Sequence, residues 1–142
     1  MSDYLKELAE DIEAIPDRRE VLELMVALGK ELDELPPEQR TETNRVPGCV
    51  SNVHVSAELD ADKQVHFRGS SDAFITRGYV QALFAAFDGW SAESFIKDAE
   101  PIVADFLKRT NLAESVIPTR ANAIGNILLT MKQQVAAKLG NA

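Results

Sequence analysis

The spacing of apolar residues switches from a helical period to a period of two and back again, and this switch constrains the fold most strongly. Apolar residues alternate with polar ones along a first stretch: Val53, Val55, Ala57 and Leu59. Val65 and Phe67 repeat the alternation beyond residues 60–63, three of which are charged. A period of two is typical of half-buried strands, and a short polar stretch between two of them is typical of a hairpin turn. The pattern therefore predicts an antiparallel hairpin.

Before this hairpin, apolar residues recur at helical spacing in two groups. The first group is Leu5, Leu8, Ala9 and Ile12, and the second is Val21, Leu24, Met25, Leu28 and Leu32. Pro16 is expected to end the first helix. Asp17 is placed to cap the second helix, with Glu20 three residues later as in a capping box. The two prolines at positions 36 and 37 are expected to stop it.

After the hairpin, the pattern predicts four more helices. Residues 69–72 are expected to end the second strand, and Asp72 is expected to cap a buried helix that reaches Asp88 and ends at Gly89. Ser91 is expected to cap a short helix through Ile96. Two further apolar stripes are Ile102, Val103, Phe106 and Leu107, and Ile124, Ile127, Leu128, Met131 and Val135, with Gly140 closing the last helix.

These elements predict an α+β fold in which a small antiparallel sheet of about three strands is flanked by helices. The 142 residues suit a single domain, 1–142, and 45% of them are hydrophobic, which is enough for a core without disulfides or metal. The single cysteine excludes an internal disulfide. The first residues do not resemble a signal peptide, and no apolar run is long enough to cross a bilayer. A cytoplasmic protein with no membrane partner is therefore expected.

The net charge of −8 comes from the first part of the chain. Residues 1–38 hold 12 acidic and 4 basic side chains, whereas the remainder holds 11 of each. This distribution argues against a nucleic-acid partner, because binding to a phosphate backbone calls for clustered lysines and arginines.

Cys49 is the side chain with the most reactive chemistry, and two interpretations of it stay open. A free cysteine is most often an inert small hydrophobe in a core. However, Pro47 removes a backbone donor and Gly48 permits a positive φ, so the segment is expected to turn tightly and to place Cys49 on a loop before the first strand. A thiol on such a loop can react if a cation favours the thiolate, and Arg45 and Arg120 are the candidates.

Other chemistries have weaker support. A zinc site would have to combine Cys49, His54 and His66, whose spacing matches no compact zinc motif. A Cys/His hydrolase pair is conceivable, but both histidines fall on the polar sides of the predicted strands. No glycine-rich phosphate loop is present in the sequence.

Three short motifs stand out: VPGCVSNV at residues 46–53, GSSDAFITRG at residues 69–78 and PTR at residues 118–120. They resemble, in that order, the persulfide loop GCxSxV, the helix start GxSDAxIxxG and a late P[ST]R motif of the SufE family of sulfur acceptors, which includes the CsdE proteins. The resemblance extends from about Ile12 to Val135. The chain departs from the family at Val50 and His54, where members often have Gln and Trp, and at Ala123, where glycine is common.

The resemblance implies a fold similar to the cluster scaffold IscU and a sulfur-carrying role. Cys49 would be the persulfide acceptor, and Gly48, Ser51, Asp72 and Arg120 would support its loop. The implied partners are a cysteine desulfurase of the SufS or CsdA type, which carries PLP, and an iron–sulfur scaffold or other downstream acceptor. The chain itself would hold no cofactor or metal, and would be a sulfurtransferase component rather than a stand-alone enzyme. The alternatives are a non-catalytic desulfurase adaptor, a thiol hydrolase and a cluster scaffold, although a scaffold normally supplies several thiolates.

Overall fold

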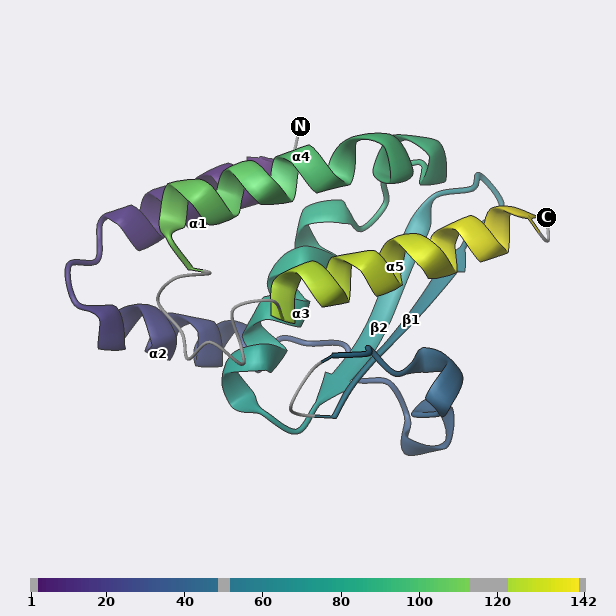
Figure 1. Ribbon diagram of the computed structural model, residues 1–142, viewed down its shortest axis with the longest axis horizontal. Coiled ribbons are helices and arrows are strands. Elements are labelled where there is room, and N and C mark those ends of the chain that lie inside the picture. Colours follow the sequence, from purple (N-terminus) through teal and green to yellow (C-terminus); the bar gives the residue numbers. More distant parts are fainter. Residues whose placement is uncertain (1–2, 49–51, 113–122, 141–142) are drawn as a thin grey trace.

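The computed structural model describes residues 3–48, 52–112 and 123–140 (Figure 1). These ranges contain five α-helices, two short 3-10 turns and one two-stranded antiparallel sheet. In chain order the elements are α1 (Asp3–Glu13), α2 (Arg18–Gly29), η1 (Pro37–Gln39), η2 (Glu42–Asn44), β1 (Val53–Leu59), β2 (Val65–Ser71), α3 (Phe74–Phe87), α4 (Ala92–Thr110) and α5 (Ala123–Gly140). The α+β class is confirmed.

The hairpin forms as predicted, with Val53 opposite Ser71 and Leu59 opposite Val65. Asp60 builds the turn, because its Oδ1 accepts hydrogen bonds from the amides of Asp62 (2.9 Å) and Gln64 (3.0 Å). The described part of the sheet has two strands rather than about three. The outer edge of β2 is paired at two places only within the described residues: Gly69 forms a bridge with Glu34, which the following prolines cannot extend, and Val65 exchanges backbone hydrogen bonds with Gly89 and Trp90.

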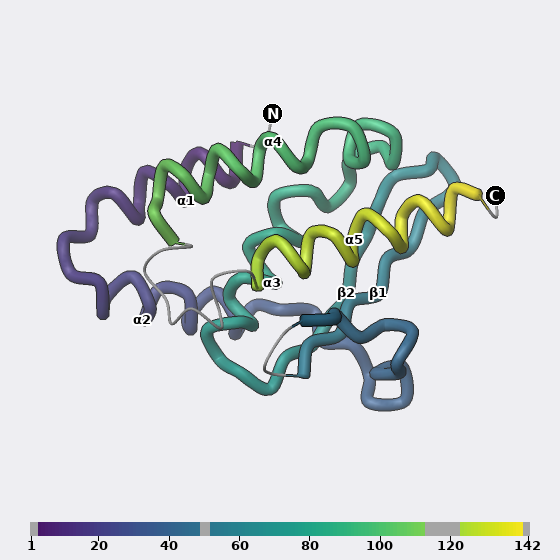
Figure 2. Tube along the Cα trace, in the orientation of Figure 1, coloured from purple at the N-terminus to yellow at the C-terminus, as the bar shows by residue number. Residues whose placement is uncertain are grey.

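Helices cover the hairpin in a defined arrangement. Helix α5 lies across β1, α3 packs against both α2 and β2, and α1 runs alongside α4 (Figures 1 and 2). Gln134 of α5 closes the free edge of β1, since its amide accepts from Ala57 N (2.8 Å) and donates to the carbonyl of Val55 (2.5 Å). This contact satisfies strand groups that an edge would leave unpaired.

The first two helices begin as predicted. The four expected residues of α1 are buried, and the side chain of Asp17 caps α2 by accepting from Arg19 N (3.0 Å). The predicted end of the second helix is wrong, because α2 stops at Gly29 rather than near the prolines. After α2 the chain makes a tighter turn, in which the amide of Lys30 donates to the carbonyl of Ala27. This turn brings Leu32 into the core.

Helix α3 crosses α2 at very short range, and Gly78 makes this possible. A Cβ atom at Gly78 would lie 2.0 Å from the carbonyl oxygen of Met25, and one at Gly29 would lie 2.8 Å from Cβ of Arg77. Both glycines therefore allow the backbones of α2 and α3 to lie close together. Helix α3 is buried on most sides, as predicted, and ends at Phe87, with Asp88 as its C-cap residue and Gly89 at φ +82°.

The two helices predicted after Gly89 are one continuous helix, α4, so this prediction is wrong. Ser91 caps it as expected, accepting from Ser94 N (3.2 Å). The helix passes through Pro101, which removes one amide donor but does not end it. One buried stripe runs past the proline and holds both halves against the core: Phe95, Ala99, Val103 and Phe106. Helix α5 follows its predicted span and buried residues.

Candidate functional site

Two short stretches flank the segment that contains Cys49: residues 45–46 before it and residues 53–54 after it. They pair with each other, and we call this pair of stretches the neck of the segment. The amide of Val46 donates to the carbonyl of Val53 (2.8 Å), and Arg45 forms an antiparallel bridge with His54. Val46 and Val53 are both buried, so the neck is fixed in the core. Cys49 and Ser51 themselves lie outside the described residues.

Gly48 anchors one side of this segment. Its φ is +79°, so the predicted tight turn with a positive φ is confirmed. A Cβ atom here would lie 2.8 Å from Nδ2 of Asn126 on α5, which means that the backbone at Gly48 packs against that side chain. Sequence reasoning missed Asn126. In the sequence, Asn126 is marked only as a polar residue within the apolar stripe of the last helix, and the structure leaves it half-buried.

Asp72 anchors the other side, and the prediction that it caps α3 is wrong. The N-cap residue is Ala73, with no side-chain cap. The carboxylate of Asp72 instead accepts from the backbone amide (3.1 Å) and the side-chain Nδ2 (3.2 Å) of Asn52. The physical reason is the register: Val53 faces Ser71 at the end of the sheet, and one residue further on the amide of Asp72 donates to the carbonyl of Asn52 (3.3 Å), so the two residues face each other.

The structure therefore brings two of the predicted site residues, Gly48 and Asp72, to opposite ends of the same short segment. Arg120 and the rest of the PTR motif fall outside the described residues. Between the ends of the segment lie residues 49–51, which include Cys49 and Ser51.

A polar pocket of about 400 Å³ lies beside the Asn52–Asp72 pair. Its lining combines charged and neutral polar side chains: Glu34, Arg40, Asn52, His54, Ser70, Ser71, Asp72 and Arg77. Glu34 is shared by the guanidinium groups of Arg77 and Arg40, the latter at 3.6 Å. The pocket thus carries both signs of charge, and Asn52, the first described residue after Cys49, forms part of its wall.

The two histidines occupy different environments. Burial, with Arg40 and Arg45 nearby, lowers the pKa of His54, which lines the polar pocket. His66 is exposed and lies between Asp60 (Nε2 to Oδ2, 2.9 Å) and Asp88 (Nδ1 to Oδ1, 3.0 Å), and these hydrogen bonds raise its pKa.

Cross-strand register separates the two histidines. His54 faces Ser70 and His66 faces Glu58, so the two are four residues apart along the hairpin, roughly 13 Å. One zinc ion cannot bind both side chains, whose ligand bonds are about 2 Å long. The zinc site that would combine Cys49, His54 and His66 is therefore not formed by this hairpin.

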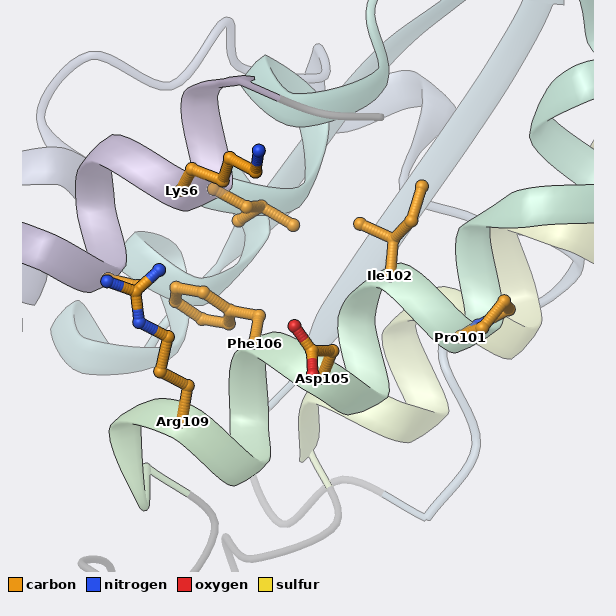
Figure 3. Close-up of a pocket in the computed structure, with 8 residues that line it drawn as sticks. Lys6, Pro101, Ile102, Asp105, Phe106 and Arg109 are labelled. Atoms are coloured by element: carbon orange, nitrogen blue, oxygen red, sulfur yellow. The ribbon is translucent and has the colours of Figure 1, made fainter.

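A second hollow lies between α1 and α4, away from these residues (Figure 3). It has a volume of about 260 Å³, and its lining is mostly apolar, with Ile102 and Phe106 among its residues. Lys6, Asp105 and Arg109 add charge, and Arg109 is already paired with Glu13 (2.7 Å). None of the residues that flank the Cys49 segment lines this hollow.

Comparison with known proteins gives a consistent result. The SufE family, described as an Fe-S metabolism associated domain, matches residues 6–135. The chain is 30% identical to an uncharacterised SufE-like protein of Synechocystis sp., covering 97% of this chain and 84% of that one. It is 28% identical to the SufE-like protein 1, chloroplastic/mitochondrial, of Arabidopsis thaliana, covering 92% of this chain and 34% of the plant protein.

A solved structure supports the fold. The solution structure of a hypothetical protein from Thermus thermophilus aligns with a TM-score of 0.76 over 99% of this chain and 98% of that chain, at 20% identity. Among the described residues, no helix is both long enough and apolar enough to span a membrane.

Proposed function

Because this chain belongs to the SufE family, whose domain is associated with Fe–S metabolism, we propose that it is a sulfur acceptor that works through Cys49. Cys49 takes persulfide sulfur from a PLP-dependent cysteine desulfurase of the SufS or CsdA type and stimulates that enzyme. It then delivers the sulfur to an iron–sulfur scaffold or another downstream acceptor. The work is done in the cytoplasm by one sulfur-acceptor domain that spans residues 1–142.

The observation that carries this proposal is the way the segment around Cys49 is held. Its neck is closed by Val46 and Val53, Gly48 packs on Asn126, and Asn52 is bound by Asp72. Holding both ends of a three-residue segment limits the positions that its thiol can reach. A thiol held in this way can be offered to one partner protein and kept from others.

The proposed chemistry needs no group beyond the thiol. The thiolate of Cys49 attacks the outer sulfur of the desulfurase persulfide, a new S–S bond forms, and the desulfurase thiolate leaves. Delivery repeats the step, with the thiolate of the next acceptor attacking the outer sulfur on Cys49. Arg45, at the neck of the segment, is a cation that would favour the Cys49 thiolate.

The test is intact-mass analysis after incubation with a cysteine desulfurase, PLP and cysteine. The wild-type protein should gain the mass of one or more sulfur atoms, and Cys49→Ser should gain none. If desulfurase turnover rises while the wild-type mass stays unchanged, the protein is an adaptor and not a carrier. Stimulation that survives in Cys49→Ala would support the same adaptor function.

We also expect no stoichiometric metal in the purified protein, since a lone thiol and two separated histidines supply too few soft ligands for one ion. Elemental analysis checks this expectation. About one zinc or iron per chain, lost in Cys49→Ser, would contradict it and would favour a metal-binding function.

A further inference from the structure

The polar pocket that Asn52 and Asp72 line is built from four parts of the chain. Asn52 and His54 come from the first strand and the residue before it, Ser70 and Asp72 come from the end of the hairpin, and Arg77 comes from the first turns of α3. Ser70 is only 5% exposed, so this wall is an inner surface of the fold. The remaining lining, Glu34 and Arg40, comes from the segment after α2.

The charged side chains of the pocket fall into two groups by the partners they contact. One group is Arg40, Arg77 and Glu34, in which a single carboxylate is shared between two guanidinium groups, leaving one excess positive charge. Arg77 lies only 24% exposed by its side chain, so its charge is partly shielded from water. His54 also lines the pocket, and its pKa is lowered first by burial and then by Arg40 and Arg45, against the opposite effect of Glu42 and Asp72.

The other group is Asp72 with Asn52, which carries one negative charge. The carboxylate of Asp72 accepts two hydrogen bonds from Asn52, one on each oxygen. An ionised carboxylate has about four acceptor positions, so it can also accept from a cation.

From this arrangement we infer that the pocket binds a small α-amino acid in its zwitterionic form. The ligand carboxylate lies against Arg40 and Arg77, where a planar guanidinium can hold both oxygens. The ligand ammonium lies against Asp72. The pocket volume of about 400 Å³ is large enough for such a molecule.

Under the proposed function, the pocket has a natural source of ligand. Removal of sulfur from cysteine leaves alanine, so substrate and product of the partner enzyme are both small amino acids. The binding itself does not depend on that function, and it is tested without the desulfurase.

The experiment is an NMR titration of the ¹⁵N-labelled full chain, followed at the backbone amides of Asn52, His54 and Ser70. The probes are L-alanine, propionate, which lacks the ammonium, and ethylamine, which lacks the carboxylate. L-Alanine should give saturable shifts at these amides, and each of the other two probes should bind at least about five-fold more weakly, as expected for loss of a partly exposed ionic contact.

Variants assign each charge of the ligand to a side of the pocket. Arg77→Gln should weaken alanine binding by about five-fold and leave ethylamine binding unchanged. Asp72→Asn should weaken alanine binding to a similar extent and leave propionate binding unchanged. Arg40→Gln provides a second test of the carboxylate side if Arg77→Gln does not fold.

Arg109→Gln is the matched control, because Arg109 pairs with Glu13 between α1 and α4 and does not line the polar pocket. It should bind alanine as the wild type does. The inference is overturned if alanine causes no saturable shift at these amides, if propionate or ethylamine binds as tightly as alanine, or if the pocket variants bind alanine as well as Arg109→Gln. A protein that binds alanine but gains no sulfur at Cys49 would contradict the proposed function and leave this inference standing.

Discussion

Asn52 and Asp72 are bound to each other by three hydrogen bonds, two of which use a backbone amide. The amide of Asn52 donates to Oδ1 of Asp72 (3.1 Å), its side-chain Nδ2 donates to Oδ2 (3.2 Å), and the amide of Asp72 donates to the carbonyl of Asn52 (3.3 Å). Asp72 therefore holds the residue that ends the Cys49 segment, although it does not cap α3. Loss of its carboxylate should act on that segment more than on the helix.

Asp72→Ala should therefore make Cys49 alkylate faster in the free protein, since the amide and the side chain of Asn52 both lose the carboxylate oxygens that accept their hydrogen bonds. The free energy of unfolding should fall by about 1 kcal/mol, the usual net value of such hydrogen bonds at the surface. Iodoacetamide kinetics and urea unfolding measure the two effects. Asp72→Asn is the matched variant, because its remaining oxygen can still accept from the Asn52 amide, and its alkylation rate should lie between the other two.

Arg120→Ala should change Cys49 alkylation or sulfur transfer more than Arg109→Ala does. Arg120 is in the PTR motif, which resembles a family motif that supports the cysteine loop, whereas Arg109 pairs with Glu13 between α1 and α4. The same alkylation assay compares them. Equal rates for wild type, Asp72→Ala and Arg120→Ala, with stability alone reduced, would leave both residues with a purely structural role.

Gly48→Ala should destabilise the turn before Cys49 for two independent reasons. The φ of +79° strains any residue with a Cβ, and that Cβ would lie 2.8 Å from Nδ2 of Asn126. We expect a loss of about 1–3 kcal/mol in the free energy of unfolding. Urea unfolding of Gly48→Ala, Asn126→Ala and the double variant separates the two causes.

In that cycle, Asn126→Ala should relieve the contact but not the strain in φ. The double variant should therefore recover part of the loss, and the two substitutions should not be additive. Strict additivity would show that Gly48 and Asn126 do not interact.

The parts of this structure that could be predicted from sequence are those fixed by local periodicity. The hairpin, the buried face of α1 and the positive φ of Gly48 follow from spacing and residue type. The errors arise where a tertiary contact decides: a continuous buried stripe carries α4 through Pro101, and cross-strand register takes Asp72 away from the N-cap position. Asn126 and Gln134 were missed for the same reason, because a polar residue on a helix gives no sign of the backbone that it will contact.

His66 should make stability depend on pH near neutrality. Its folded pKa is raised by hydrogen bonds to Asp60 and then Asp88, so protonated His66 is favoured in the native state. The contribution of His66 to the free energy of unfolding is fully present below its unfolded-state pKa of about 6.5. It is lost as the pH rises through the higher pKa of the folded state. Replacement by Gln should therefore reduce stability more at about pH 5.5 than at about pH 8.

His54 is the internal contrast for this measurement. Its pKa is lowered, first by burial, so in an NMR titration it should release its proton at lower pH than His66. The prediction fails if the two pKa values fall in the opposite order, or if the stability difference for His66→Gln is constant across this pH range. Either result would mean that Asp60 and Asp88 do not stabilise protonated His66.

Gly78→Ala should be among the most destabilising single-methyl additions in the chain. The new Cβ would lie 2.0 Å from the carbonyl oxygen of Met25 and 2.6 Å from its carbonyl carbon, so α2 and α3 would have to move apart. Backbone atoms cannot rotate away as a side chain can, and we expect a loss of about 3 kcal/mol or more in the free energy of unfolding.

Gly125→Ala is the matched control, since it lies in α5 with nothing within 4 Å of the added Cβ. It should raise stability by about 0.5–1 kcal/mol, because alanine favours the helix over glycine. Thermal and urea unfolding of the two variants give the comparison, and similar stabilities would mean that α2 and α3 do not approach as closely at Gly78 as the structure has them.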